Sequence, residues 1–161
     1  MNAGLIRDAN ERDAGAITDL WTEAYFAEGE GGRTAPYAEA DFFETARSAQ
    51  VFVSEREGTV IGVVALVAPG TPDRAVAQVD EAELSRLVVP ASARRLGIGR
   101  ALVGHCHELA RTAGWSAIVL WSRRYQTAAH RLYESLGYKR VPERDETDES
   151  GHERMVFRLA L

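Results

Sequence analysis

The hydrophobic pattern of the chain changes its period at Pro90. Before it, "EAELSRLVV" is typical of a strand, which must end at a proline because proline donates no sheet hydrogen bond. After it, apolar residues recur every three or four positions until Gly114, where a helix is expected to close. Gly97 and Gly99 stand where this long helix begins. The amino terminus of a helix is therefore predicted directly after a strand.

The remaining segments predict a single α/β domain spanning residues 1–161. The patterns predict a strand from Leu5, helices over 17–25, 37–48 and 126–137, a hairpin over 50–69, and strands over 116–122, 138–142 and 154–161. Two loops are expected, a mobile one at 28–37 and an acidic one at 143–153. With 161 residues, 45% of them hydrophobic, and no repeat or linker, one core is expected.

Composition excludes several classes of protein. The formal net charge of -5 argues against a general nucleic-acid binder, so any basic site must be local. The single cysteine, Cys106, excludes an internal disulfide framework and a multi-cysteine metal cluster, and it fits a reducing compartment. The amino terminus lacks an apolar signal segment, and about 18 apolar residues never run together. A cytoplasmic protein without a membrane segment or bound metal is expected.

The glycine turn has the properties of an anion site. Free backbone N–H groups and the helix dipole attract anions at a helix amino terminus. From Ser85 to His107 there is no acidic residue, and the same stretch holds four arginines, Arg86, Arg94, Arg95 and Arg100. Phosphate is therefore the expected ligand type.

Two common phosphate motifs do not fit this turn. A P-loop requires lysine and a hydroxyl residue after its last glycine, but His105 and Cys106 follow Gly104. A dinucleotide-binding turn requires a third glycine where this chain has Leu102.

Two motifs resemble the GNAT superfamily of N-acetyltransferases. "LSRLVVPASARRLGIGRAL" is similar to its acyl-CoA motif, [RQ]-x-x-G-x-[GA], through Arg94, Gly97 and Gly99. Downstream, "AAHRLYESLGYKRV" is similar to the family's closing helix and strand. The resemblance implies a central mixed, mostly antiparallel sheet of about seven strands, splayed in the middle and flanked by about four helices. It also implies acetyl-CoA as co-substrate and a primary amine of a small molecule or peptide as acceptor.

The resemblance also implies which residues hold the co-substrate. The pantetheine arm would lie between the strand ending in "RLVV" and "SAIVLWS", beside the backbone of Leu87, Val88 and Val89. The pyrophosphate would rest on the turn, whose residues are Arg94, Arg95, Leu96, Gly97, Ile98, Gly99 and Arg100. Gln126 occupies the position of a family asparagine that helps hold the cofactor, and it is one methylene longer.

Acetyl transfer to an amine calls for two groups that handle protons. The amine must lose a proton before attack, and the departing thiolate must gain one. Tyr133 matches the family tyrosine beside the thioester sulfur and is the expected acid, although its spacing alone favours a core residue. Strand alternation puts Glu83 on the same side as Leu87 and Val89, so Glu83 is the expected base through a water molecule. The alternative for Glu83 is an ordinary surface position or a charge pair. The backbone N–H of Val89 is expected to donate a hydrogen bond to the oxyanion that develops during attack.

The acceptor site is less defined by the sequence. In this fold the acceptor enters between the first helices and the loop joining the last two strands. That loop carries five acidic residues that would attract a cationic amine or simply be solvated, namely Glu143, Asp145, Glu146, Asp148 and Glu149. Cys106 and the neighbouring histidines are expected to be structural, because consecutive helical residues point in different directions.

Three functions are consistent with the sequence. The first is an N-acetyltransferase in which the amine attacks directly through a tetrahedral intermediate. The second is a catalytically silent acyl-CoA-binding regulatory module, and the third is a nucleotide or nucleic-acid binder that uses the arginine turn. Relatives in the family are often homodimers, but no segment of this sequence indicates an interface, so a homodimer and a monomer both remain open.

Overall fold

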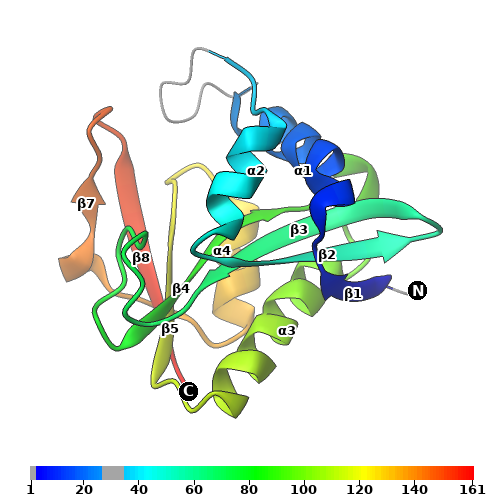
Figure 1. The fold of residues 1–161 in the computed structure, drawn as a ribbon. Coiled ribbons are helices and arrows are strands. Elements are labelled where there is room, and N and C mark those ends of the chain that lie inside the picture. The colour runs from blue at the N-terminus through cyan, green and yellow to red at the C-terminus, as the bar shows by residue number, and fades with distance from the viewer. Residues whose placement is uncertain (1–2, 27–34) are drawn as a thin grey trace. The chain divides into compact units, whose positions relative to one another are not determined.

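The computed structural model describes residues 3–26 and 35–161 (Figure 1). Most of the loop expected at 28–37 lies outside the described residues. The chain forms two compact units, the first from Met1–Leu66 and Arg86–His105, the second from Val67–Ser85 and Cys106–Leu161.

The first unit is built on three antiparallel strands. They are β1 (Leu5–Asp8), β2 (Gln50–Arg56) and β3 (Thr59–Val67), hydrogen-bonded in the order β1-β2-β3. The expected hairpin is confirmed, since Glu57 and Gly58 turn the chain with φ of 51° and 78°. Two consecutive residues with positive φ match the twist of a two-residue hairpin turn.

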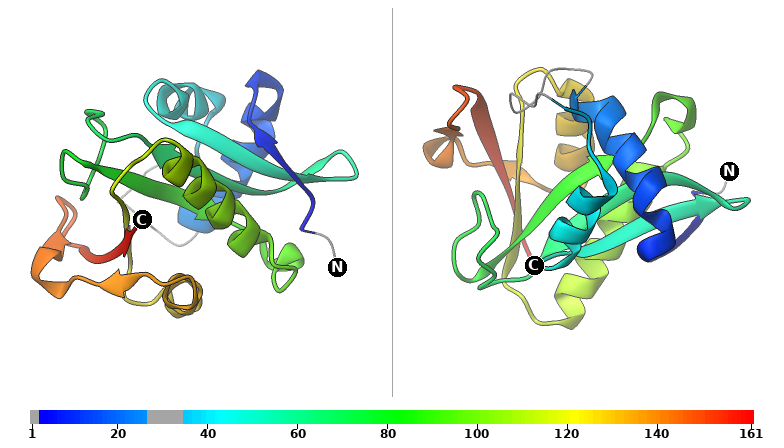
Figure 2. Two further views of the ribbon diagram at one scale, coloured as in Figure 1. Left: turned by 90° about the horizontal axis from the view of Figure 1, so that it is seen from below. Right: turned by 45° about the horizontal axis from the view of Figure 1, so that its top comes forward.

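Helices α1 (Ala14–Trp21) and α2 (Glu39–Ala46) cover one face of β2 and β3 (Figure 2). A π-helical turn over Thr22–Phe26 follows α1 directly. Alternation along β2 sends Val51 and Val53 into the core under these helices. The same alternation turns Phe52 to the opposite face, where its ring lies 4.6 Å from that of His105 in α3 (Ile98–Thr112).

The second unit contains the start of β4 (Glu81–Val88) and the carboxyl-terminal part of α3. Its other elements are β5 (Ala117–Ser122), α4 (Thr127–Ser135), β6 (Lys139–Arg140), β7 (Glu146–Thr147) and β8 (Glu153–Ala160). β5 pairs with β8 over six residue pairs, and β6 and β7 also pair with β8, all antiparallel. Gly114, with φ of 76°, follows the end of α3 as expected.

β4 and β5 are parallel neighbours only at their beginnings. Their ladder joins Glu81–Glu83 to Ala117–Val119 and ends there, although β5 continues to Ser122. Parallel strands that separate leave backbone groups without sheet partners. The early end of this ladder agrees with a sheet that is splayed in the middle.

The described residues contain eight strands and four α-helices. The expected mixed, mostly antiparallel sheet is confirmed, with β7 as one strand more than the sequence indicated. Three short 3-10 helices, over Glu11–Asp13, Ala91–Ala93 and Pro142–Arg144, complete the elements. No helix in the described ranges is long and apolar enough to cross a membrane.

Candidate functional site

The turn between β4 and α3 has an unusual backbone. Arg95 and Gly97 have φ of 67° and 76°, in the left-handed region, which is strained for the arginine. Alternation of left-handed and right-handed residues points successive N–H groups to one side and forms an anion-binding concavity. The strain at Arg95 is therefore at the place where the sequence predicts an anion site.

Five successive amides of this turn have no hydrogen-bond acceptor among the residues that the structure describes. The Arg94 amide donates to the Ala91 carbonyl, and the Ala101 amide donates to the Gly97 carbonyl. Between them, the N–H groups of residues 95 to 99 donate to no other described residue. They stand at the amino terminus of the longest helix described, where the dipole adds partial positive charge.

A close contact between β3 and α3 fixes the position of the turn. A Cβ atom built on Gly62 would lie 2.8 Å from Ile98 Cγ2 and 2.9 Å from Leu102 Cδ1. Only glycine allows the first turn of the helix to approach the strand so closely. Ile98 and Leu102 are fully buried, so the start of α3 is held by packing.

The end of β4 departs from regular strand geometry at Arg86, whose φ is 52°. Val88 is buried in the core of the first unit, while Leu87 and Val89 are half-buried. The sequence expectation that Glu83 and Leu87 lie on one side relied on unbroken alternation. Arg86, the left-handed residue between them, interrupts this alternation. The alternation therefore no longer supports placing Glu83 and Leu87 on the same side of the strand.

Glu83 lies in the second unit and is almost fully buried, at 3% exposure. Its Oε2 atom accepts hydrogen bonds from the amides of Val76 and Ala77, both at 2.8 Å. The Ala75 amide lies 3.0 Å from both carboxylate oxygens. Among the described residues Oε1 has this shared contact alone, so it can accept a further hydrogen bond.

Tyr133 lies in α4 with 7% exposure. Its ring packs edge-on against Tyr138 and against Phe157, at centroid distances of 5.7 Å and 6.1 Å. Burial raises the pKa of the Tyr133 hydroxyl above that of an ordinary phenol. The hydroxyl forms no hydrogen bond with any residue the structure describes, so its proton can be donated to a ligand.

Gln126 occupies the position before α4 and uses its side chain to shape the turn. Its Oε1 atom accepts hydrogen bonds from the Ser122 hydroxyl at 2.9 Å and the Arg123 amide at 2.7 Å. Its carbonyl oxygen is therefore engaged within the chain, which leaves the amide NH2 for a ligand.

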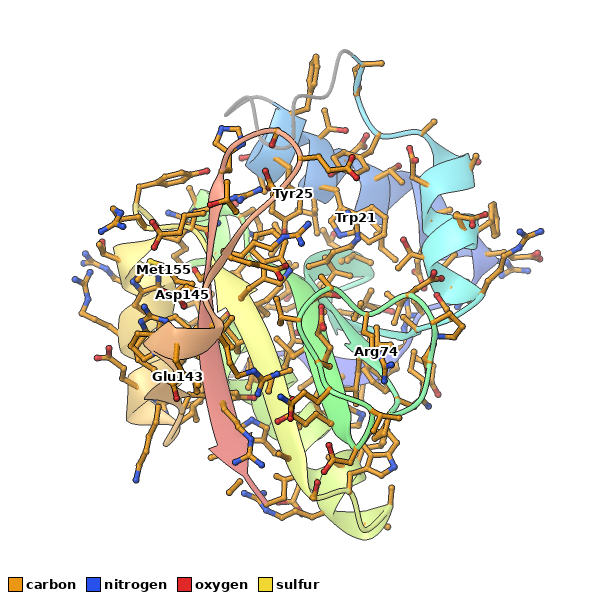
Figure 3. All side chains as sticks on the ribbon, turned by 90° about the vertical axis from the view of Figure 1, so that its left-hand side faces the viewer. Trp21, Tyr25, Arg74, Glu143, Asp145 and Met155 are labelled. Atoms are coloured by element: carbon orange, nitrogen blue, oxygen red, sulfur yellow. The ribbon has the colours of Figure 1, made fainter. Side chains whose placement is uncertain are left out.

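The acidic segment near the carboxyl terminus is largely paired with arginines. Asp145 bonds Arg140 at 2.7 Å, Glu146 bonds Arg154 at 2.7 Å, and Asp148 bonds Arg123 at 2.8 Å. Glu143 is exposed beside them (Figure 3). The pairing reduces the attraction for a cationic amine that the sequence suggested, because each carboxylate is close to a positive charge.

Two buried polar groups in the second unit have no signal in the sequence. Glu81 accepts hydrogen bonds from Arg144 and Arg158, and His107 bonds the Tyr138 hydroxyl at 2.9 Å. Both are buried, and in each case the partners are more than 30 residues apart in sequence. No local pattern could have identified these pairs.

The candidate nucleophile and metal ligands have structural surroundings. Cys106 is fully buried, and burial raises the pKa of its thiol to about 12. No group of three or more His, Cys, Asp or Glu side chains within residues 3–26 and 35–161 is arranged to hold a metal ion.

The model of the acetyltransferase (GNAT) family matches residues 14–138. N-acetyltransferase family 8 member 3 of Rattus norvegicus is 34% identical over 57% of this chain and 39% of its own length. N-acetylaspartate synthetase of Xenopus tropicalis is 40% identical over 56% of this chain and 31% of its own length. This chain thus spans well under half of the curated relatives that it matches.

Solved structures share the fold over nearly the whole chain. A ribosomal-protein-alanine N-acetyltransferase from Brucella melitensis superposes with a TM-score of 0.77 at 23% identity, covering 98% of this chain and 99% of that one. A putative acetyltransferase from Salmonella typhimurium, solved with its cofactor acetyl-CoA, also gives 0.77, at 22% identity over 99% and 95% of the two chains.

Proposed function

The chain belongs to the acetyltransferase (GNAT) family, and from this premise we propose that it transfers an acetyl group from acetyl-CoA to a primary amine. The acceptor class is a small molecule or a peptide. The family match runs from Ala14 to Tyr138 and includes residues of both units, which supports treating 1–161 as one acetyltransferase domain.

One observation carries the proposal. Five adjacent amides, of residues 95 to 99, have no acceptor within the described chain. A pyrophosphate supplies oxygen acceptors for such a row of donors and does not require a metal ion. We assign the row to the pyrophosphate of acetyl-CoA, with the exposed arginines Arg94, Arg95 and Arg100 contributing positive charge.

The backbone at the end of β4 is proposed to hold the rest of the co-substrate. Leu87, Val88 and Val89 would hydrogen-bond the pantetheine arm, helped by the NH2 group of Gln126. The Val89 N–H has no acceptor among the described residues, so it can stabilise the oxyanion of a tetrahedral intermediate.

Tyr133 is proposed as the proton donor to the departing thiolate. Burial keeps its hydroxyl protonated across the working pH range, as a donor requires. The same burial widens the gap between the pKa of Tyr133 and that of a thiol, about 8.5. Full transfer of the proton is therefore less favourable than for an ordinary tyrosine. A hydrogen bond to the developing thiolate is the main contribution expected of Tyr133.

Glu83 is proposed as the base that removes the ammonium proton through a water molecule. Oε2 is occupied by amides, so Oε1 would accept the proton. The neutral amine then attacks the thioester carbonyl, and a C–N bond forms as the C–S bond breaks. Of the two protons that the nitrogen loses, Glu83 takes the first, and the thiolate takes up the second through the hydroxyl of Tyr133. The same carboxylate also anchors residues 75–77, a role that mutation must separate from catalysis.

The cellular setting is proposed from composition and family. A single buried cysteine suits a reducing cytoplasm, and the net charge of -5 disfavours nucleic acid as a partner. A homodimer is the proposed assembly, to be checked by light scattering.

The decisive experiment is binding followed by turnover. Acetyl-CoA at 100 times its dissociation constant should stabilise the protein by about 2.7 kcal/mol without magnesium, whereas ATP should not. Thiol release with a panel of amines then separates an enzyme from the silent acyl-CoA-binding module. If acetyl-CoA produces no stabilisation, the proposal is wrong in both forms.

A further inference from the structure

A half-buried arginine in β4 is stacked on two aromatic rings of the first unit. The guanidinium carbon of Arg86 lies 4.8 Å from the ring centroid of Trp21 and 5.5 Å from that of Tyr37. One of its nitrogens is 3.5 Å from the Tyr37 hydroxyl, at the outer limit of a hydrogen bond. No carboxylate pairs with Arg86 anywhere in the described chain.

The indole of Trp21 adds a second unused donor. Trp21 is fully buried, and its Nε1 atom has no hydrogen-bond partner among the described residues. A buried N–H without an acceptor destabilises the fold, because the hydrogen bond that it made to water is lost. Buried donors of this kind are few in folded proteins, and a bound ligand with an oxygen acceptor is one explanation for this donor.

The local backbone is also strained at this place. Arg86 has a φ of 52° inside a strand, a conformation that is strained for a residue with a side chain. Trp21 ends α1, and a π-helical turn that includes Tyr25 follows it (Figure 3). Strained residues and π-helical turns gather at ligand sites, so both features favour binding over simple packing.

We propose that Arg86 and the Trp21 indole N–H bind a carboxylate of the amine acceptor. The acceptor is then a small amino acid rather than a plain amine or a polyamine, and this inference rests on the proposed acetyltransferase function. A guanidinium can stack one face on an aromatic ring and still donate two parallel hydrogen bonds from its edge to a carboxylate. One guanidinium also balances the single charge of a carboxylate, whereas a phosphate dianion would need more.

The position of Arg86 in the chain suits this role. Arg86 immediately precedes Leu87, and Val89, whose N–H is proposed to meet the oxyanion, is three residues further on. Three strand residues span about 10 Å at most, and the arginine side chain adds reach in either direction. A carboxylate on Arg86 could therefore belong to the same small molecule as the attacking amine.

The test compares acceptors that differ only in the carboxylate. Common amino acids are each paired with their carboxamides, and rates are corrected for the fraction of neutral amine. The wild-type protein should favour the amino acid by about 30-fold or more in kcat/KM, as expected for a buried charged hydrogen bond. Arg86→Gln should remove this preference mainly through KM and leave the carboxamide rate within a few-fold.

Two further variants give the test its controls. Arg86→Lys keeps the charge but loses the planar fork, so it should recover only part of the preference. Arg47→Gln removes an exposed arginine that pairs with Glu44 on α2, and it should behave as wild type. Stabilisation by acetyl-CoA should be the same in all three variants.

Binding provides a readout that does not depend on turnover. An accepted amino acid should quench or shift the fluorescence of Trp21, and the change should disappear in Trp21→Phe. Equal rates for amino acids and carboxamides, or a preference that survives Arg86→Gln, would overturn the inference while leaving the transferase function intact. If acetyl-CoA stabilises the protein but no amine is turned over, the transferase function is refuted. In that case the fluorescence measurement still tests this inference, which is refuted if no amino acid binds through its carboxylate.

Discussion

The backbone amide of Val76 donates a 2.8 Å hydrogen bond to Oε2 of Glu83. The amides of Ala75 and Ala77 converge on the same carboxylate. Three consecutive amides around one buried anion fix the segment that precedes β4, because each is charge-assisted. The residue proposed as the base is therefore also part of the scaffold.

Replacing Glu83 by glutamine separates its two roles. The variant loses the charge, and its NH2 group would face amide donors, so a loss of about 1.5 to 3 kcal/mol in unfolding free energy is expected. If Glu83 is also the base, kcat should fall by about 10²-fold or more at a pH where the protein is still folded. Urea unfolding and steady-state kinetics measure the two effects. The exposed Glu108→Gln serves as control and should change neither.

Tyr133→Phe should reduce kcat with little effect on stability. The hydroxyl makes no hydrogen bond in the described chain, so its removal leaves no broken contact. Loss of a proton donor is expected to lower kcat by about 10² to 10⁴-fold. Thiol release and thermal unfolding provide the measurements.

Tyr138→Phe is the matched comparison for Tyr133. This variant removes the hydrogen bond to His107, so it should cost about 1 kcal/mol in stability while kcat stays close to wild type. A large fall in kcat for Tyr138→Phe, or none for Tyr133→Phe, would show that the acid is not Tyr133.

Gly97→Ala should weaken acetyl-CoA binding beyond its effect on folding. Gly97 has φ of 76°, so alanine there is strained by about 1 kcal/mol. The added methyl group would also stand at the proposed pyrophosphate site and hinder the ligand. Gly58 in the hairpin has φ of 78° and, like Gly97, nothing within 4 Å of an added Cβ. Both variants should lose similar stability, but only Gly97→Ala should lower the affinity measured by calorimetry. Equal affinities would remove Gly97 from the site.

Glu81 should control stability in strong acid. Burial works against its ionisation, but hydrogen bonds from Arg144, the Gln78 amide and Arg158 outweigh it and lower its pKa to about 2. A carboxylate whose pKa is lowered by folding stabilises the protein at pH values above its pKa in the unfolded chain, which is near 4.3. This contribution disappears as the pH falls toward 2. On the order of 3 kcal/mol should be lost in this window. In Glu81→Gln, stability should be lower at neutral pH and should fall less steeply between pH 4 and 2 than in the wild type, as followed by urea unfolding.

His107 should produce a separate loss of stability at milder pH. Burial lowers the pKa of its imidazole to about 4, and the charge of Arg111 acts in the same direction. Below about pH 6.5 the unfolded chain binds a proton that the folded protein does not take up until about pH 4, so stability falls across that interval. His107→Gln keeps a partner for Tyr138 without titrating and should flatten the interval. An NMR titration that gives His107 an ordinary pKa would contradict this.

The elements were predictable where one local pattern set them. The hairpin at Gly58, the long helix closed at Gly114 and the strand before Pro90 follow from backbone chemistry of single residues. The strand expected over 138–142 is shorter in the structure, where β6 covers only Lys139 and Arg140, because Pro142 begins a 3-10 turn. β7 was not expected, since its two residues lie in an acidic segment with no strand pattern.

The candidate site was predictable only in part. The glycine turn could be recognised because its backbone donors, glycines and arginines are contiguous. The surroundings of Glu83 were misjudged, since alternation gives the side of a strand but not the loop that folds over it. The aromatic contacts of Arg86 were not visible either, because Trp21 and Tyr37 lie 49 or more residues away in sequence.

By itself, the sequence determined the order of strands and helices, the family and the glycine turn that is proposed to hold the pyrophosphate, because each depends on neighbouring residues and local backbone preferences. Only the tertiary structure decided which charges are satisfied and which donors remain open. Glu81 meets Arg144 and Arg158 across 63 and 77 residues, while Arg86 meets two aromatic rings and no carboxylate in the described chain. The strength of a charge pair depends on distance and burial, and folding sets both through contacts between residues far apart in the chain.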